Sequence, residues 1–202
     1  MAVGDGSGGD ERSGPAWTAW LAALAAAGVD GVQLRAPWRD DRALYELARA
    51  AVELPGTPSS IWINGRADLA LATGCDGVQL PARGVPLPPL RRRFATHLRF
   101  GASTHTLDEV RRRRDEGADM VIFGPVFSTP SKEGIFEPRG LELLAEAVAT
   151  GVPVLAIGGI DATRAAAVAA TGAHGIAAIR LFAHPARDAA ALAAVRALWP
   201  PA

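Results

Sequence analysis

The chain has 202 residues, and its 21 Lys and Arg balance its 21 Asp and Glu, so the formal net charge is zero. That length allows one substantial core, and the balanced charge gives no overall field to attract nucleic acid or an anionic membrane. The single cysteine, Cys75, excludes an internal disulfide. The longest apolar stretch near the start, Ala16 to Ala27, is too short to span a bilayer, and the first residues lack the basic region and apolar core that are typical of a signal peptide. We expect one soluble, cytoplasmic domain over 1–202, without nucleic-acid or membrane partners.

The first expected element is a short strand. Ala2 and Val3 are apolar, but the glycine-rich run from Gly4 to Gly9 follows at once and cannot remain in a strand or helix. Either the first strand is cut short or its true beginning lies upstream, and residues 1–14 are expected to be flexible. A first helix should begin near Pro15 and end at Gly28.

A repeated pattern organises the remainder of the chain. Four helix-like stretches each end in a glycine that leads into an apolar run, in the segments GVDGVQ, GCDGVQ, GADMVI and GAHGIA, which begin at Gly28, Gly74, Gly117 and Gly172. Three further apolar runs alternate with them, at Ser59 to Asn64, Leu98 to Ser103 and Pro153 to Gly159. With the amino-terminal strand this gives eight strand-plus-helix units. We predict an α/β fold, a single-domain (βα)8 TIM barrel with a shortened first strand, in preference to an open doubly wound sheet.

The loop after the sixth strand is the first candidate for function. Residues Ser128, Thr129, Ser131 and Lys132 place three hydroxyls and one ammonium on a loop that Pro130 keeps out of regular structure. Such a loop at the carboxyl end of a buried strand is typical of an anion clamp, most simply for phosphate. A polar surface loop with a solvated lysine is the alternative.

Other strand ends add candidates to the same rim. Gly158 and Gly159 precede a helix start, where backbone N–H groups can approach a phosphate, although a tight turn would use the same residues. Arg35 could hold a phosphate with two hydrogen bonds or take part in a salt bridge. His105 could act as a general base or cap a helix. The neutral groups expected at the rim are Gln33, Asn64, Gln79, Ser103 and Ile179, next to Arg180.

Seven segments together resemble the thiamine phosphate synthase/thiazole tautomerase (TenI-type) superfamily. In chain order they read GVQLR, INGRADLAL, GVQLP, GASTHTLDEV, GADMVIFGPVFSTPSK, GLELL and VPVLAIGGI. The resemblance covers almost the whole chain. It implies a (βα)8 barrel of thiamine metabolism that binds a phosphorylated thiazole, and it suggests a homodimer.

The resemblance also implies roles for individual residues. It places Thr129, Ser131 and Lys132 in the family's T-x-T-K phosphate loop, with Ser131 in place of a threonine, and makes Gly159 a backbone phosphate ligand. The positions that it aligns with the pyrimidine and pyrophosphate site of the synthases are Gln33, Arg35, Asn64 and Ser103.

The chain departs from both branches of the superfamily. Pro37 replaces a pyrophosphate-holding lysine of the synthases, and Gly65 and Gly84 replace their two magnesium-binding aspartates. The NGR and VQLP segments are closer to the tautomerases, which need no metal. Pro125, however, stands where that branch has its general acid/base histidine, which leaves His105 as the histidine expected at the rim.

These features give a ranked set of functions. The leading expectation is a metal-independent thiazole tautomerase, an isomerase, with no cofactor. The first alternative is a divergent thiamine phosphate synthase, a transferase for which pyrophosphate would recruit Mg2+ with few protein ligands. The second alternative is a binding protein for thiamine phosphate or thiazole phosphate that has lost catalysis.

Overall fold

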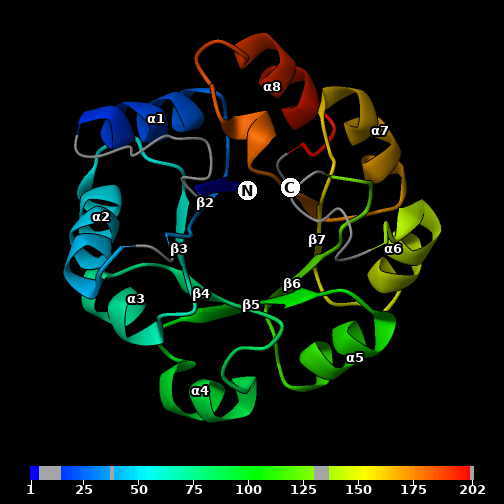
Figure 1. Cartoon of the computed structure of the whole chain (residues 1–202), viewed down its shortest axis with the longest axis horizontal. Helices are drawn as coiled ribbons and strands as arrows, with labels where there is room; N and C mark the ends of the chain where they lie inside the picture. Colours follow the sequence, from blue (N-terminus) through cyan, green and yellow to red (C-terminus); the bar gives the residue numbers. More distant parts are fainter. Residues whose placement is uncertain (5–14, 37–38, 130–136, 201–202) are drawn as a thin grey trace.

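Eight parallel strands lie side by side in chain order and form a nearly closed ring in the computed structural model (Figure 1). The structure describes residues 1–4, 15–36, 39–129 and 137–200. The strands are β1 (Ala2–Gly4), β2 (Gly31–Leu34), β3 (Ser60–Asn64), β4 (Gly77–Leu80), β5 (Arg99–Thr104), β6 (Met120–Phe123), β7 (Val154–Ile157) and β8 (Gly175–Ala177). The seam between β1 and β8 is held by a bridge from Ala2 to Ala178. The predicted barrel, with its short first strand, is confirmed.

The helices surround the strands on the outside of the ring (Figure 1). They are α1 (Pro15–Ala26), α2 (Asp41–Glu53), α3 (Ala67–Thr73), α4 (Leu87–Phe94), α5 (Leu107–Asp115), α6 (Gly140–Val148), α7 (Ala162–Ala170) and α8 (Ala189–Arg196), with a 3-10 turn η2 (Arg180–Phe182) after β8. No helix in the described part of the chain has the length and hydropathy needed to cross a membrane. The expected flexible stretch at 5–14 lies outside the described residues and stays a prediction.

The glycines of the repeated pattern end helices as predicted. Their φ angles lie in the left-handed region, at 72° for Gly28, 76° for Gly74, 87° for Gly117 and 80° for Gly172. A residue with a side chain is strained there, whereas glycine turns the chain from a helix into the next strand without that cost. The repeated pattern therefore fixes where four of the strands begin.

The inside of the barrel has an apolar half and a polar half. Residues paired in register face the same side of a sheet, and Val3, Ile122, Leu155 and Ala177 form one buried apolar cluster inside the ring. Val3 pairs with Gln33, and Ser103 pairs with Ile122, so these polar side chains also face inward. Strands β6, β7, β8 and β1 thus supply apolar groups, and β2 to β5 supply mostly polar groups.

Missing side chains on the inner face of β4 and β5 make room for large ones. An alanine Cβ at Gly77 would lie 2.5 Å from two ring atoms of Trp62, and one at Gly101 would overlap the Gln79 carbonyl oxygen.

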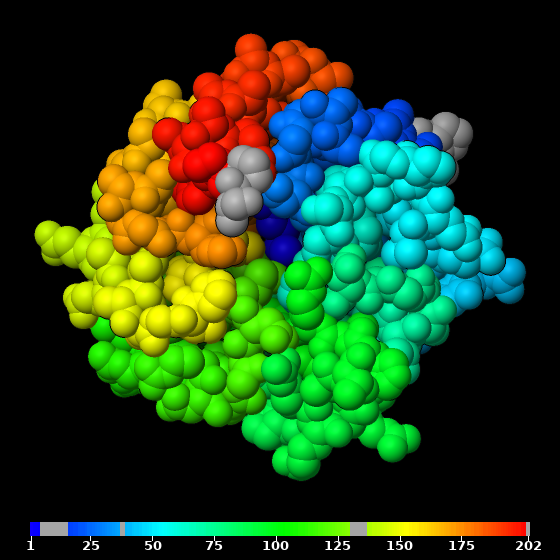
Figure 2. All heavy atoms as spheres, turned by 180° about the vertical axis from the view of Figure 1, so that it is seen from behind, coloured from blue at the N-terminus to red at the C-terminus, as the bar shows by residue number. Residues whose placement is uncertain are grey.

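Figure 2 shows the molecule from behind, with the amino-terminal residues in dark blue at the centre of the face. The chain start is thus part of the barrel, and it does not lie on its outer surface.

Candidate functional site

A cavity of about 570 Å³ lies at the carboxyl ends of the strands. This volume falls within the range of about 300–1,000 Å³ that is usual for small-molecule sites. Most of the predicted site residues that the structure describes line this one cavity: Gln33, Arg35, Asn64, Ser103, His105, Thr129, Gly158, Gly159, Ile179 and Arg180. Ser131 and Lys132 lie outside the described residues, so their place in a phosphate loop stays a prediction.

The loop after β6 packs directly on the glycine turn after β7. The Val126 N–H donates to the Ile157 carbonyl at 2.8 Å, and the Phe127 N–H donates to the Gly158 carbonyl at 3.0 Å. Gly159 has a φ of 64°, and a Cβ there would overlap the Ser128 carbonyl oxygen. Only glycine permits this approach, which brings the two loops predicted to bind phosphate into contact.

A guanidinium completes this corner of the cavity. Arg180 donates from Nη2 to the Thr129 hydroxyl at 3.3 Å, and both residues line the cavity. Arg164 lies with its guanidinium 5.0 Å from the Phe127 ring centroid and donates to the Gly159 carbonyl at 2.6 Å. Cationic groups therefore flank the contact between the two loops.

The amino terminus of α7 is occupied by the chain's own carboxylate. Asp161 caps the helix by accepting from the Thr163 N–H at 3.0 Å and the Arg164 N–H at 3.1 Å. The Thr163 hydroxyl and these N–H groups lower the pKa of Asp161. The sequence pointed to a phosphate at this helix start. A phosphate would instead have to use the glycine turn, because Asp161 already takes both N–H groups.

Two amide contacts run along the polar half of the ring. Gln33 donates from Nε2 to Asn64 Oδ1 at 2.9 Å, and Gln79 donates from Nε2 to Ser103 Oγ at 3.1 Å. The sequence placed Gln79 at the rim, and this was wrong. Gln79 is fully buried beneath the cavity, and Ser103 is the member of that pair that lines it.

Sequence reasoning missed most of the apolar wall. Ile122, Ile157 and Ile160 line the cavity, together with Val3 and Pro125. Only Ile179 was expected there. The signal that could have found them is the alternation along each strand, since Ile122 and Ile157 share the inward face with Leu155 and Ala177.

His105 lies on the cavity wall just before the Thr106 cap of α5. Its ring Nδ1 lies 2.5 Å from the Gly124 carbonyl oxygen. A carbonyl oxygen can only accept, so Nδ1 carries the hydrogen, and Nε2 is then the nitrogen with the basic lone pair. The geometry of His105 is compatible with proton transfer through Nε2.

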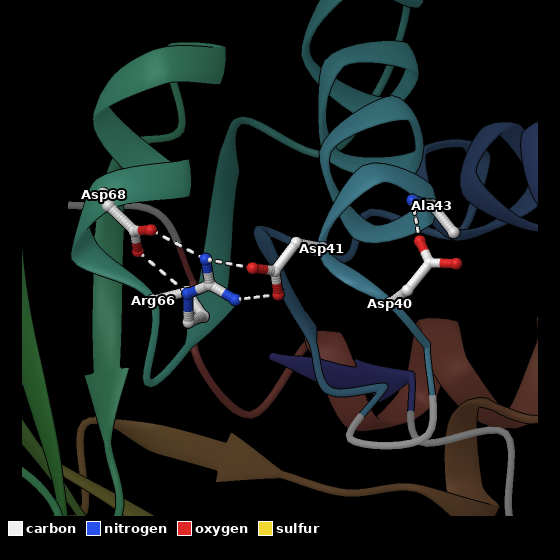
Figure 3. A network of polar contacts seen from close by, with 5 residues as sticks. All are labelled: Asp40, Asp41, Ala43, Arg66 and Asp68. Atoms are coloured by element: carbon white, nitrogen blue, oxygen red, sulfur yellow. Dashed lines mark hydrogen bonds and ion pairs between the residues drawn. The ribbon is translucent and has the colours of Figure 1, made fainter.

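The arginine of the NGR segment serves the scaffold. Arg66 forms ion pairs with Asp41, at the start of α2, and with Asp68, in the first turn of α3 (Figure 3). Its Nη2 lies 2.7 Å from Asp68 Oδ2. The hydrogen bonds to the carboxylates of Asp68 and Asp41 raise the pKa of Arg66, and the bond to the guanidinium lowers the pKa of Asp68. Asp40 caps α2 beside this network by accepting from the Ala43 N–H at 2.8 Å.

The donor set of the cavity does not fit a protein-held magnesium ion. Its lining, within the described residues, offers amides, hydroxyls, a histidine and two arginines, and no carboxylate. Magnesium requires hard oxygen ligands, usually carboxylates. Across the same residues no cluster of three or more His, Cys, Asp or Glu is arranged to hold a metal. Gly65 and Gly84 supply no side-chain ligand at the two aspartate positions implied by the resemblance.

Comparison with known proteins identifies the family. A family model described as thiamine monophosphate synthase matches residues 9–182. The thiamine-phosphate synthase of Anaeromyxobacter dehalogenans is 40% identical over 173 residues, which are 85% of this chain and 78% of that protein. That of Neisseria meningitidis serogroup B is 36% identical over 183 residues, 89% of each chain.

A solved structure agrees with the sequence comparisons. Thiamine phosphate pyrophosphorylase from Pyrococcus furiosus superposes with a TM-score of 0.84 at 28% identity, covering 98% of this chain and 96% of that one. Both the matched family model and these relatives span well over half of the chain. This chain therefore belongs to the thiamine monophosphate synthase family, within the superfamily that its sequence segments resemble, and to thiamine biosynthesis.

Proposed function

We propose that this chain is a transferase of the thiamine-phosphate synthase type, which joins hydroxymethylpyrimidine pyrophosphate to a thiazole phosphate and releases pyrophosphate. The observation that carries the proposal is the composition of one cavity, where a cationic, glycine-lined corner adjoins a wall of amides and a hydroxyl. Relatives at 36–40% identity are named thiamine-phosphate synthase. These names favour the transferase over the tautomerase, which reverses the order expected from the sequence.

The corner formed by the loops after β6 and β7 suits the phosphate of the thiazole. Thr129 offers a hydroxyl, Gly158 and Gly159 offer an approach to the backbone, and Arg180 offers a positive charge. Ser131 and Lys132 would extend this corner if they take the places that the family pattern implies.

Two guanidinium groups suit the pyrophosphate, and one of them, Arg180, also borders the corner proposed for the thiazole phosphate. Arg35 follows β2 and Arg180 follows β8, so they line the cavity on either side of β1 in the ring. Negative charge grows on the pyrophosphate as its bond to the pyrimidine methylene breaks, and fixed cations stabilise that charge. The apolar wall of Ile122, Ile157 and Ile179 limits the water that could compete for the activated pyrimidine. Both contributions, the stabilisation of charge and the exclusion of water, come from side chains of the protein.

The test is to mix the purified chain with both substrates, with and without magnesium, and to measure thiamine phosphate. We expect product that depends on the protein. Arg180→Ala should lower kcat/KM about tenfold or more, since hydrogen bonds to charged groups are worth about 1.5–3 kcal/mol. Arg187→Ala is the matched control, because Arg187 is exposed, paired with Asp188 and outside the cavity lining. Binding of both substrates without product would contradict the proposal and favour a binding role.

A thiazole tautomerase is the second candidate, and His105 is the observation that favours it. The bond from Nδ1 to the Gly124 carbonyl fixes the ring and leaves Nε2 as the base. His105→Ala should abolish isomerisation of the thiazole carboxylate phosphate while its binding persists. An unchanged isomerisation rate in that variant would exclude this role for His105. The homodimer suggested by the resemblance stays a prediction.

A further inference from the structure

Two buried glutamines support the polar wall of the cavity: Gln33 is part of its lining, and Gln79 lies behind it. Gln33 is 4% exposed, and Gln79 is fully buried. Each donates its Nε2 hydrogen to a side chain on the wall, Gln33 to Asn64 and Gln79 to Ser103. Asn64 and Ser103 both line the cavity, and Gln79 does not. Gln79 can therefore influence a ligand only through the groups that it touches.

The direction of these hydrogen bonds decides what the wall offers to a ligand. A serine hydroxyl has one hydrogen, and its oxygen can also accept. Since Gln79 donates to Ser103 Oγ, the Ser103 hydrogen is directed away from Gln79 and can be offered to the cavity. In the same way Gln33 occupies Asn64 Oδ1, and Asn64 Nδ2 has no partner among the described residues. Both wall residues are then hydrogen-bond donors toward the cavity.

Gln79 is unfavourable as a purely structural residue. Its carbonyl oxygen, Oε1, is buried and has no hydrogen-bond partner in the described part of the chain. A buried polar atom without a partner destabilises a fold, whereas a methionine of similar size would avoid that cost. The chain also accommodates the amide with Gly101, where a Cβ would overlap Oε1. The hydrogen bond from Gln79 to Ser103 explains why an amide is present at this position despite its cost in stability.

We propose that Gln79 is a positioning residue that holds Ser103 as a hydrogen-bond donor toward the ligand. Together with the Gln33–Asn64 pair it makes the wall formed by β3 to β5 select a ring that presents acceptor atoms, such as the ring nitrogens of a pyrimidine. The naming of a pyrimidine rests on the proposed function. The role of Gln79 rests on its contact with Ser103 and on its unpartnered carbonyl.

A double-mutant cycle on the full chain tests this role. Gln79→Met, Ser103→Ala and the double variant are compared with the unaltered chain in calorimetric binding of hydroxymethylpyrimidine pyrophosphate. We expect Gln79→Met to raise Kd about three- to tenfold, the range for one ordinary hydrogen bond. In the Ser103→Ala background the same change should have no further effect, because Gln79 acts through the Ser103 hydroxyl.

Thermal unfolding of the same variants separates positioning from structural support. Gln79→Met should leave Tm unchanged or raise it, since it removes an unpartnered buried carbonyl. Thr104→Val is the matched control. Thr104 is a fully buried residue of β5 whose hydroxyl donates to the Ile122 carbonyl at 3.3 Å, outside the cavity lining. Loss of this hydroxyl in Thr104→Val should lower Tm and leave the Kd for hydroxymethylpyrimidine pyrophosphate unchanged.

The outcomes distinguish this inference from the proposed function. Equal effects of Gln79→Met in both backgrounds, or a lower Tm with unchanged Kd, would overturn the role of Gln79 alone. A tighter Kd in Gln79→Met would also overturn it, since Ser103 would then have been donating to Gln79. A coupled cycle without thiamine phosphate formation would refute the transferase and support the positioning role. Failure of the unaltered chain to bind the pyrimidine pyrophosphate would overturn both.

Discussion

Replacing Gly159 with alanine should destabilise the fold and weaken binding of thiazole phosphate. The φ of 64° costs an alanine about 1–2 kcal/mol. Its Cβ would also overlap the Ser128 carbonyl oxygen and lie 2.8 Å from Phe127 Cβ. Such overpacking costs about 1–3 kcal/mol, which brings the total to about 2–5 kcal/mol. In a chain of this size each kcal/mol shifts Tm by about 2–4 °C, so a total of about 3 kcal/mol lowers Tm by about 6–12 °C.

The matched control is Gly56→Ala. Gly56 has a φ of 71°, and an alanine Cβ there would meet no atom within 4 Å, so only the backbone strain remains. Thermal unfolding followed by circular dichroism compares the two variants, and calorimetry gives their affinities for thiazole phosphate. A Gly159→Ala variant no less stable than Gly56→Ala, with unchanged affinity, would refute the argument that contact between the two loops builds the phosphate corner.

Three further predictions concern the scaffold. Gly77→Ala should cost about 1–3 kcal/mol in urea unfolding because its Cβ meets the Trp62 ring, and Trp62→Leu in the same chain should recover part of that loss. Asp161→Ala should cost about 1 kcal/mol at pH 7 through loss of the α7 cap. Because the folded pKa of Asp161 is lowered, its contribution is complete above the ordinary value of about 3.9 and is lost as pH falls through the folded pKa, so the stability difference between the two proteins should shrink as pH falls below about 3.9. Arg66→Ala should cost at most about 1 kcal/mol, less in high salt, and leave ligand affinity unchanged, and a large loss of affinity would contradict its scaffold role.

The fold could be predicted because its signals are local. Gly28, Gly74, Gly117 and Gly172 end helices in the left-handed conformation, and the apolar run after each one forms a strand. The apolar strands must be covered on both faces, which indicates an α/β fold with parallel strands, and the count of eight units favours the closed barrel over an open sheet. Nothing beyond short stretches of sequence is needed for this inference.

The details of the site depend on relations between strands, which short stretches do not contain. Gln79 is followed by only one strand residue, Leu80, and so looked like a rim residue, yet its register against Gly101 buries it below the cavity. The sequence showed a helix start after Gly158 and Gly159, but the capture of two N–H groups by Asp161 depends on the backbone geometry of the cap. Whether the chemistry is transfer or isomerisation was also out of reach, because Gly65, Gly84 and Pro125 remove the distinguishing side chains of both branches.

The short first strand has a consequence for motion. Among the described residues, three hydrogen bonds hold the seam between β1 and β8: the Val3 N–H donates to the Ala178 carbonyl at 2.9 Å, the Ala178 N–H donates to the Met1 carbonyl at 3.2 Å, and the Met1 amino group donates to the Ile176 carbonyl at 2.7 Å. Few hydrogen bonds have to break for this seam to open, so its amides should exchange with solvent sooner than those of β4 and β5. Val3 and Ala178 also line the cavity, so opening of the seam would widen the space available to a ligand. The barrel is therefore expected to be most compliant at the edge of its site that lies between Arg35 and Arg180.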